Sequence, residues 1–259
     1  MSFLAALACS LLVVIALTLL ELRAKRRGGD WLVNLQAWAV NLVAALTVYR
    51  LFAVWHGPAL IDGAALPLWL GIALFIVVQD LGEYLFHRVQ HAIPWLWAMH
   101  SLHHSDPEMS ALTTSRHFWG DRLIKSLTVW PAAYLVIAPT PEALTVYAIT
   151  SLWHYVAHAN LPLDFGRWSW MLNSPAYHRR HHSSLPEHYD SNFAALFPIF
   201  DVIAGSYHRP VDYPPTGFER RPGNAIELLG WPLIARGRAK TQAAVDAAAL
   251  CEPAGRAEA

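Results

Sequence analysis

Histidine is the residue type in this 259-residue chain whose number and spacing suggest a functional site. There are fourteen, and ten of them form four short clusters: His87 and His91; His100, His103 and His104; His154 and His158; and His178, His181 and His182. Residues spaced by three or four positions share one face of a helix, so each cluster is predicted to aim its imidazoles at one point. Imidazole is a common metal ligand, and this pattern therefore predicts metal binding.

The number of histidines indicates more than one metal ion. Ten ligands exceed the six of an octahedral site, whereas two ions would take about five each and keep a position open for substrate or oxygen. The two cysteines, Cys9 and Cys251, are too few and too far apart for a thiolate site. Imidazole without thiolate suits iron, zinc, copper or nickel. An oxygen-accessible pair of metal ions with only neutral ligands, next to a lipid-lined volume, favours iron.

The elements that must position these histidines are predicted to be membrane helices. Hydrophobic residues make up 55% of the chain and charged residues 15%, against about 25% charged in ordinary soluble domains. Disorder is thus excluded for most of the chain, and a net charge of zero gives no field that would attract nucleic acid. Charges are absent from five long blocks: residues 1–20, 31–49, 63–79, 126–141 and 143–163.

A bilayer core needs about 20 apolar helical residues, and three segments meet that length: 1–20, 31–55 and 66–86. The last two blocks are shorter, and Pro139 and Pro141 lie between them, so residues 123–155 are predicted to form a helical hairpin that spans or dips into the membrane. The predicted fold is an all-α integral membrane domain of about three spans plus this hairpin, with a histidine-rich helical cap on the cytoplasmic side.

Positive charges set the predicted orientation. A cleaved signal peptide carries them before its apolar run, whereas here they follow it, from Arg23 to Arg27. The positive-inside rule makes this cluster cytoplasmic, and all four histidine clusters then lie on the cytoplasmic face. Alanine and arginine usage and short loops favour a bacterial inner membrane. We expect a membrane span at 1–22, a membrane domain with its cap at 31–240, and a disordered tail at 241–259.

These motifs resemble the fatty acid hydroxylase and sterol desaturase superfamily of membrane-bound di-iron oxygenases, from about residue 80 to residue 207. Besides the ten histidines, the resemblance is carried by Asp80, Tyr84, Arg88, Ser105, Asp106, Pro107, Asn160, Pro175, Arg179, Ser183, Asn192, Phe193, Asp201, Gly205, Ser206 and Tyr207. Arg116 and His117 represent the family's Arg-x-His segment only loosely. Ala194 and Phe200 stand where the family usually has glycine and tryptophan. The resemblance implies two iron ions and O₂-dependent hydroxylation or desaturation of an unactivated C–H bond of a lipid. It also implies an electron donor such as a reductase, cytochrome or ferredoxin.

Metal-bound imidazoles usually donate their other N–H to an acceptor, and acidic residues near the clusters are candidates for that role. Asp80 and Glu83 are the leading ones, since both lie on the helix that carries His87; the alternative is that they pair with Arg88 or with an arginine of the cap. Asn192 is also assigned to the site. Weaker candidates are Asn160, Asp190 and Asp201, together with His117 and His188, which could orient ligands; His56 and His208 are expected at the membrane interface and the surface.

Two other classes of protein remain open at this point. A metal transporter or storage protein would need polar residues at mid-membrane depth, where the second span offers little beyond Asn34, Gln36, Asn41 and Thr47. A zinc-dependent membrane hydrolase would need about three protein ligands and a glutamate base. Sterols, fatty acyl chains, sphingoid lipids, alkanes and carotenoids all remain candidate substrates.

Overall fold

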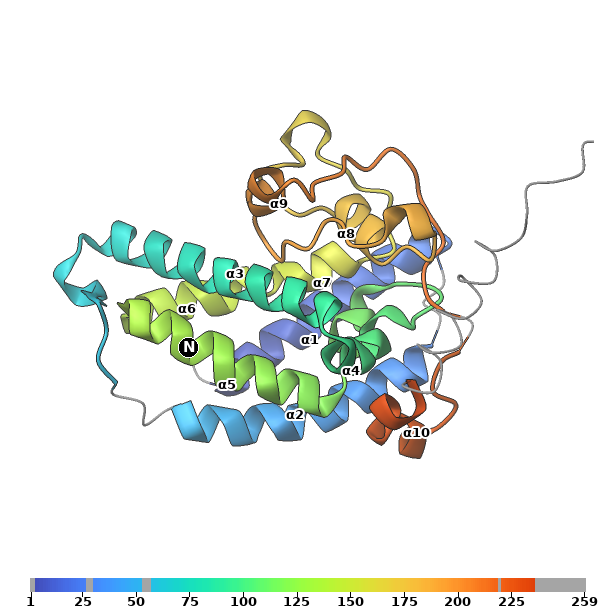
Figure 1. Ribbon diagram of the computed structural model, residues 1–259, viewed down its shortest axis with the longest axis horizontal. Helices are drawn as coiled ribbons and strands as arrows, with labels where there is room; N and C mark the ends of the chain where they lie inside the picture. Colours follow the sequence, from blue (N-terminus) through green and yellow to red (C-terminus); the bar gives the residue numbers. More distant parts are fainter. Residues whose placement is uncertain (1–2, 27–29, 53–56, 219, 236–259) are drawn as a thin grey trace, which may run out of the picture.

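The computed structural model describes residues 3–26, 30–52, 57–218 and 220–235. Five of its helices form an elongated bundle: α1 (Phe3–Arg23), α2 (Trp31–Phe52), α3 (Leu68–Ala92), α5 (Trp119–Val136) and α6 (Pro141–Thr150) (Figure 1). Within the described ranges, two helices are long and apolar enough to cross a membrane, Leu4–Arg23 and Leu68–Ala92. The fold is therefore mainly helical with membrane-type helices, as predicted. The number of spans stays a prediction, and His56 and the tail 241–259 lie outside the described residues.

Local sequence explains where these helices begin and end. Helix α3 ends at Ala92, just before Ile93 and Pro94, because a residue that precedes proline is pushed out of the helical region. The segment 123–155, predicted to form a helical hairpin, contains most of α5 and all of α6, and its depth in the membrane stays a prediction. Thr140 caps α6 by accepting a hydrogen bond from the Ala143 amide, and Pro141 occupies the first turn, where its missing N–H costs nothing.

Two short strands join the loop before α3 to the hairpin turn. Strand β1 (Ile61–Asp62) pairs in parallel with β2 (Ile137–Ala138), next to the short 3-10 helix η1 (Gly63–Ala65). Gly63 permits this approach, because a Cβ atom there would lie 2.4 Å from the carbonyl oxygen of Ala138. The loop and the turn, both free of lysine and arginine, thus lie at the same end of the bundle.

Short helices cover the other end of α3 and one side of the bundle (Figure 1). They are α4 (Pro94–His104), η2 (Ala111–Ser115), α7 (Trp153–His158), η3 (Gly166–Trp168), α8 (Pro175–His181), η4 (Pro186–His188), α9 (Ile199–Ala204) and α10 (Ala225–Leu229). These are the segments that carry the second, third and fourth histidine clusters.

A buried arginine connects three of these elements. Arg116 is fully buried and donates to the Asn34 side chain at 3.1 Å and to Ser105 Oγ at 2.9 and 3.0 Å. Its guanidinium also lies 3.3 Å from an Asp30 carboxylate oxygen, and Asn34 in turn donates to Asp106 at 2.8 Å. The network ties α2 to the end of α4 and to the start of α5, and so fixes the segment that carries His100, His103 and His104.

A second buried carboxylate fastens the first helix. Glu21, near the end of α1, accepts hydrogen bonds from the backbone amides of Ala111 at 3.0 Å and Asn160 at 2.7 Å. Asn160 lies two residues after His158, so this contact holds the third histidine cluster against α1.

Replacing Arg116 by alanine is expected to lower the free energy of unfolding by about 3–5 kcal/mol, because it leaves buried acceptors and a carboxylate without their partner. The apparent Tm of the detergent-solubilised protein, followed by circular dichroism, measures the effect. Arg209→Ala, which removes an exposed arginine, is the matched control. Equal Tm values for the two variants would contradict a stabilising role for Arg116.

Candidate metal centre

Nine of the ten predicted ligands come together in two groups at the end of α3. Group one contains His87, His91, His100, His104 and His181, and group two contains His103, His158, His178 and His182. In each group, one ring nitrogen from every histidine lies within 4.8 Å of the others. Helices α3, α4 and α8 supply group one, and α4, α7 and α8 supply group two, with His182 following directly after the last residue of α8.

The prediction that each cluster aims at one point is wrong for the two triplets, and helix geometry explains why. Successive residues of an α-helix are rotated by about 100°, so residues i and i+4 differ by about 40°, whereas residue i+3 lies about 60° to the other side. Accordingly His100 and His104 belong to group one and His103 to group two. In α8 the same rule sends His178 and His182 to group two and His181 to group one. The H-x-x-H-H spacing therefore supplies both groups from one helix.

The nitrogen atoms of these groups fit metal ions. His87 Nε2 lies 3.1 Å from His100 Nε2, and His158 Nε2 lies 3.0 Å from both His103 Nε2 and His178 Nε2. In the described part of the chain, four further Nε2 atoms are buried without a hydrogen-bond partner, those of His91, His104, His181 and His182. A buried nitrogen without a partner costs free energy, and a cation shared by several lone pairs satisfies them together.

Backbone carbonyls hold several of the rings from behind. The Nδ1 atoms of His87, His158 and His181 lie 2.7, 2.7 and 2.8 Å from the carbonyl oxygens of Phe193, His154 and Ser191. An imidazole that donates its Nδ1–H to a carbonyl presents the lone pair of Nε2 on its other side, which is the arrangement of a metal ligand.

Burial also keeps the imidazoles in their ligand form. It lowers the pKa of His100 to about 3 and that of His158 to about 3. It lowers the pKa values of His104 and His178 well below the ordinary value, with neighbouring histidines adding to the effect. These rings are therefore neutral at pH 7, and only a neutral imidazole has a lone pair to offer a metal ion.

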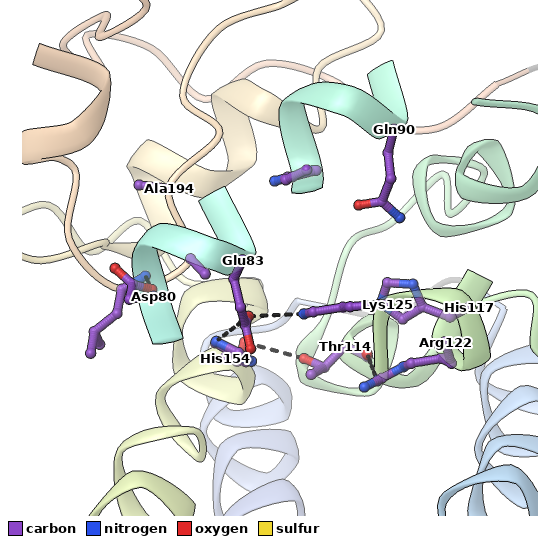
Figure 2. Close-up of polar contacts among 12 residues, drawn as sticks. Asp80, Glu83, Gln90, Thr114, His117, Arg122, Lys125, His154 and Ala194 are labelled. Carbon is purple, nitrogen blue, oxygen red and sulfur yellow. Dashed lines mark hydrogen bonds and ion pairs between the residues drawn. The ribbon is translucent and has the colours of Figure 1, made fainter. Parts of the chain in front are cut away.

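The tenth predicted ligand, His154, lies outside both groups. Its Nε2 is 3.8 Å from Glu83 Oε2, and the same carboxylate accepts hydrogen bonds from Lys125 at 2.8 Å and from Tyr147 at 2.7 Å (Figure 2). Glu83 was predicted to support the metal ligands. Within the described part of the chain, its hydrogen bonds and ion pairs are instead with Lys125, Tyr147 and His154, and none is with the nine grouped histidines.

Asp80 and Asn192 position a loop that in turn positions a ligand. Asp80 accepts hydrogen bonds from the backbone amides of Leu196 at 3.0 Å and Phe197 at 2.9 Å, and the predicted alternative, a pair with Arg88, does not appear among its contacts. Asn192 has a positive φ of 58° and its amide bonds the backbone of His208 in both directions. Both residues therefore fix the segment that contains Phe193, whose carbonyl oxygen contacts Nδ1 of His87.

The weaker candidates have different roles. Asp190 lies 3.4 Å from His91 Nδ1, whereas Asp201 accepts from the backbone amides of Phe193 and Ala194. Asn160 accepts from Arg179. His188 bonds Ser183, the residue after His182, with Nδ1 2.9 Å from Oγ.

Sequence reasoning missed Asp121, which connects the two groups. One of its carboxylate oxygens lies 3.4 Å from His100 Nδ1 and 3.3 Å from His117 Nδ1, and the other accepts from the Gln90 amide. The His117 ring stacks on His103 of group two, with ring centroids 4.1 Å apart and planes 13° apart. Asp121 follows His117 by four positions at the start of a helix, and that spacing was the available signal.

Comparison with known proteins agrees with this geometry. Residues 72–206, just over half of the chain and including all ten clustered histidines, match the model of the fatty acid hydroxylase family. The chain belongs to this family. No solved structure gives a significant match.

Curated relatives within this range carry oxidoreductase names. The chain is similar to ornithine lipid hydroxylase of Rhizobium tropici (30% identical, covering 56% of this chain and 44% of the relative). It is also similar to alkylglycerol monooxygenase of Xenopus tropicalis (30% identical, 60% and 34%) and to Delta(7)-sterol 5(6)-desaturase of Gibberella zeae (25% identical, 55% and 44%). The chain thus spans from about a third to less than half of the length of these relatives.

Alanine substitutions in either group are expected to lower bound metal from about two ions per chain towards one, because each removes a ligand from a single group. His104→Ala tests group one and His182→Ala tests group two, with metal counted by mass spectrometry after dialysis against a chelator. His154→Ala should keep both ions, as should the control His208→Ala. Loss of an ion from His154→Ala would return His154 to the ligand set.

Replacing Asp121 by asparagine is expected to weaken metal retention about 10- to 100-fold, since an amide of the same shape lacks the charge that orients His100 and His117. Competition with a chelator of known affinity measures the change. Asp190→Asn is the control, because Asp190 also faces a ligand but its side chain is 76% exposed. If the two variants retain metal equally well, burial of Asp121 has no special effect.

Proposed function

We propose that this protein is a membrane-bound di-iron oxygenase that hydroxylates or desaturates an unactivated C–H bond of a lipid. The observation that supports this most directly is the pair of adjacent histidine groups, one with five and one with four ring nitrogens. Five and four neutral ligands leave room on each ion for a further small ligand. The names of the curated relatives, which describe lipid hydroxylation, monooxygenation and sterol desaturation, support the same reaction class.

The proposed hydroxylation balances as follows. One C–H bond and one O₂ molecule, with two electrons and two protons, give one alcohol and one water. Bound iron would supply the binding and reduction of O₂. The electrons come from a separate one-electron donor such as a reductase, cytochrome or ferredoxin.

The side chains have three tasks in this scheme. The nine grouped histidines hold the metal ions, and the carbonyl oxygens of Phe193, Ser191 and His154 keep the rings oriented. Seven of the nine are buried and the other two, His87 and His91, are half-buried, which limits the access of bulk water and protects a reactive site from side reactions. In this scheme the apolar helices α1 and α3 lie in the bilayer, from which a lipid can arrive without crossing water.

Two observations weigh against the other classes. A transporter needs polar residues free to line a path, but Asn34 bonds Asp106 and Arg116, and Asn41 donates to the carbonyl of His117 at 2.8 Å. A zinc hydrolase needs about three ligands and a free glutamate base, but Glu83 is held by Lys125 and Tyr147.

Expression in a host of defined lipid composition is expected to yield a lipid product that is one oxygen atom heavier, or two hydrogen atoms lighter, than its precursor. Mass spectrometry of the total lipid extract identifies it. His182→Ala should give no product, because it removes a ligand of group two. Protein purified without oxygen should contain about two irons and consume O₂ when reduced. Retention of zinc without oxygen consumption would refute the proposal.

A further inference from the structure

A small cleft adjoins both histidine groups. One wall consists of histidines from group one and group two, among them His87, His100 and His103. Polar side chains from four helices line another wall: Glu83 of α3, Thr114 of η2, Arg122 and Lys125 of α5, and His154 of α7 (Figure 2). A group that enters the cleft therefore meets the metal ligands on one side and charged side chains on the other.

The size of the cleft limits what can enter. Its volume is about 80 Å³. That is enough for a few small atoms, since a cavity needs about 10–15 Å³ to hold one water, whereas pockets that enclose a whole drug-sized ligand measure about 300–1,000 Å³. An acyl chain or a sterol nucleus does not fit. Only one small end of a lipid can occupy the cleft.

The charges on the polar wall leave one cation without a partner. Glu83 is neutralised by Lys125, whose Nζ lies 2.8 Å from Oε2. Arg122 donates from Nη2 to the Thr114 carbonyl at 3.1 Å, but its buried Nε has no hydrogen-bond partner and, among the described residues, no carboxylate pairs with its guanidinium. The wall thus carries one excess positive charge, on the Arg122 guanidinium, which still has N–H groups without an acceptor.

A guanidinium without a carboxylate partner is well suited to bind an oxyanion. Its parallel N–H groups fit the two oxygens of a carboxylate or two oxygens of a phosphate, and such charge-assisted bonds are about twice as strong as neutral ones. Arg122 lies three positions before Lys125 on α5, so both cations project towards the cleft from the same helix face, while Glu83 closes the opposite side (Figure 2).

We propose that this cleft is a head-group subsite in which Arg122 binds a carboxylate or phosphate of the lipid substrate. This inference rests on the proposed function and makes it more specific. The lipid head group is then bound at Arg122, and the histidine groups lie on the other side of the same small cleft. The carbon that is oxidised therefore lies within a few bonds of the head group. The substrate is then an anionic or zwitterionic lipid that is oxidised near its polar end.

Binding of three soluble probes tests the subsite on the metal-loaded protein in a neutral maltoside detergent. Octanoate, octyl phosphate and octanol share one chain length and differ in the head. Titration calorimetry is expected to show at least tenfold tighter binding of one or both anions than of octanol, because a hydrogen bond to a charged group has that effect. Tighter octanoate binding assigns a carboxylate, and tighter octyl phosphate binding a phosphate. Equal binding of all three probes by the wild-type protein would by itself overturn the proposal.

Variants place the effect on Arg122. Arg122→Gln should lose the preference for the anion while its metal content stays at the wild-type value, and Arg122→Lys should keep part of the preference because it keeps the charge. Arg209→Gln removes an exposed arginine of the cap and should bind as wild type does. An unchanged preference in Arg122→Gln would show that the anion binds elsewhere.

The position of the new functional group separates this proposal from the proposed function. Tandem mass spectrometry of the lipid product should place the oxygen or double bond within the first few carbons from the head. A product oxidised in the middle of its chain would refute the head-group subsite and leave the oxygenase intact. Anion binding by Arg122 without any oxidised product would refute the oxygenase alone.

Discussion

Nine imidazoles that converge at one end of a helical bundle are the constraint on which the structure depends. A buried ring nitrogen without a partner costs free energy, and this end of the bundle contains several of them. Protonation cannot relieve that cost, since burial and the neighbouring rings hold the pKa of His104 and His182 far below neutrality. Bound cations can relieve it for all the rings together. We therefore expect metal binding to be coupled to folding of the short helices that carry these rings, as in other sites whose ligands come from distant segments.

Buried polar contacts, rather than one large apolar core, hold the histidine-bearing segments in position. The buried hydrophobic residues form several small clusters, and the segments that carry histidines are fixed by single carboxylates or guanidiniums: Glu21 at α1, Asp80 at α3, Arg116 after η2 and Asp201 in α9. Each of these holds the backbone of another segment, and so transmits the position of the long helices to the metal ligands. In the proposed membrane setting, where the long helices face lipid, apolar contact has little power to specify such positions, whereas a buried hydrogen bond has one geometry.

Sequence reasoning succeeded where the determining information is local. Helix positions followed from apolar length, and the ligand clusters followed from spacing of three and four residues. The division of His100, His103 and His104 between two groups also follows from local helix rotation, once two groups are considered. The contacts of Asp80, Glu83 and His154 could not be read from the sequence, because their partners lie far along the chain: Asp80 accepts from the amides of Leu196 and Phe197, and Glu83 accepts from Lys125 and Tyr147. Asp121 was missed because its role depends on three elements that meet only in the folded chain.

The polar lining of the cleft limits which part of a lipid can approach the grouped histidines. Moving an acyl chain out of the bilayer to present a central carbon requires an apolar tunnel, because each methylene exposed to a polar surface forfeits about 0.8 kcal/mol. The cleft beside the histidines is lined by Glu83, Arg122 and Lys125, with Ala157 and Ala195 as its apolar residues, and its volume is far smaller than that of an acyl chain. A lipid bound by its head avoids this cost, because the chain stays beside the apolar α3 while only the first atoms enter. In the proposed subsite, the same side chains that exclude the tail therefore select the end of the lipid at which oxidation takes place.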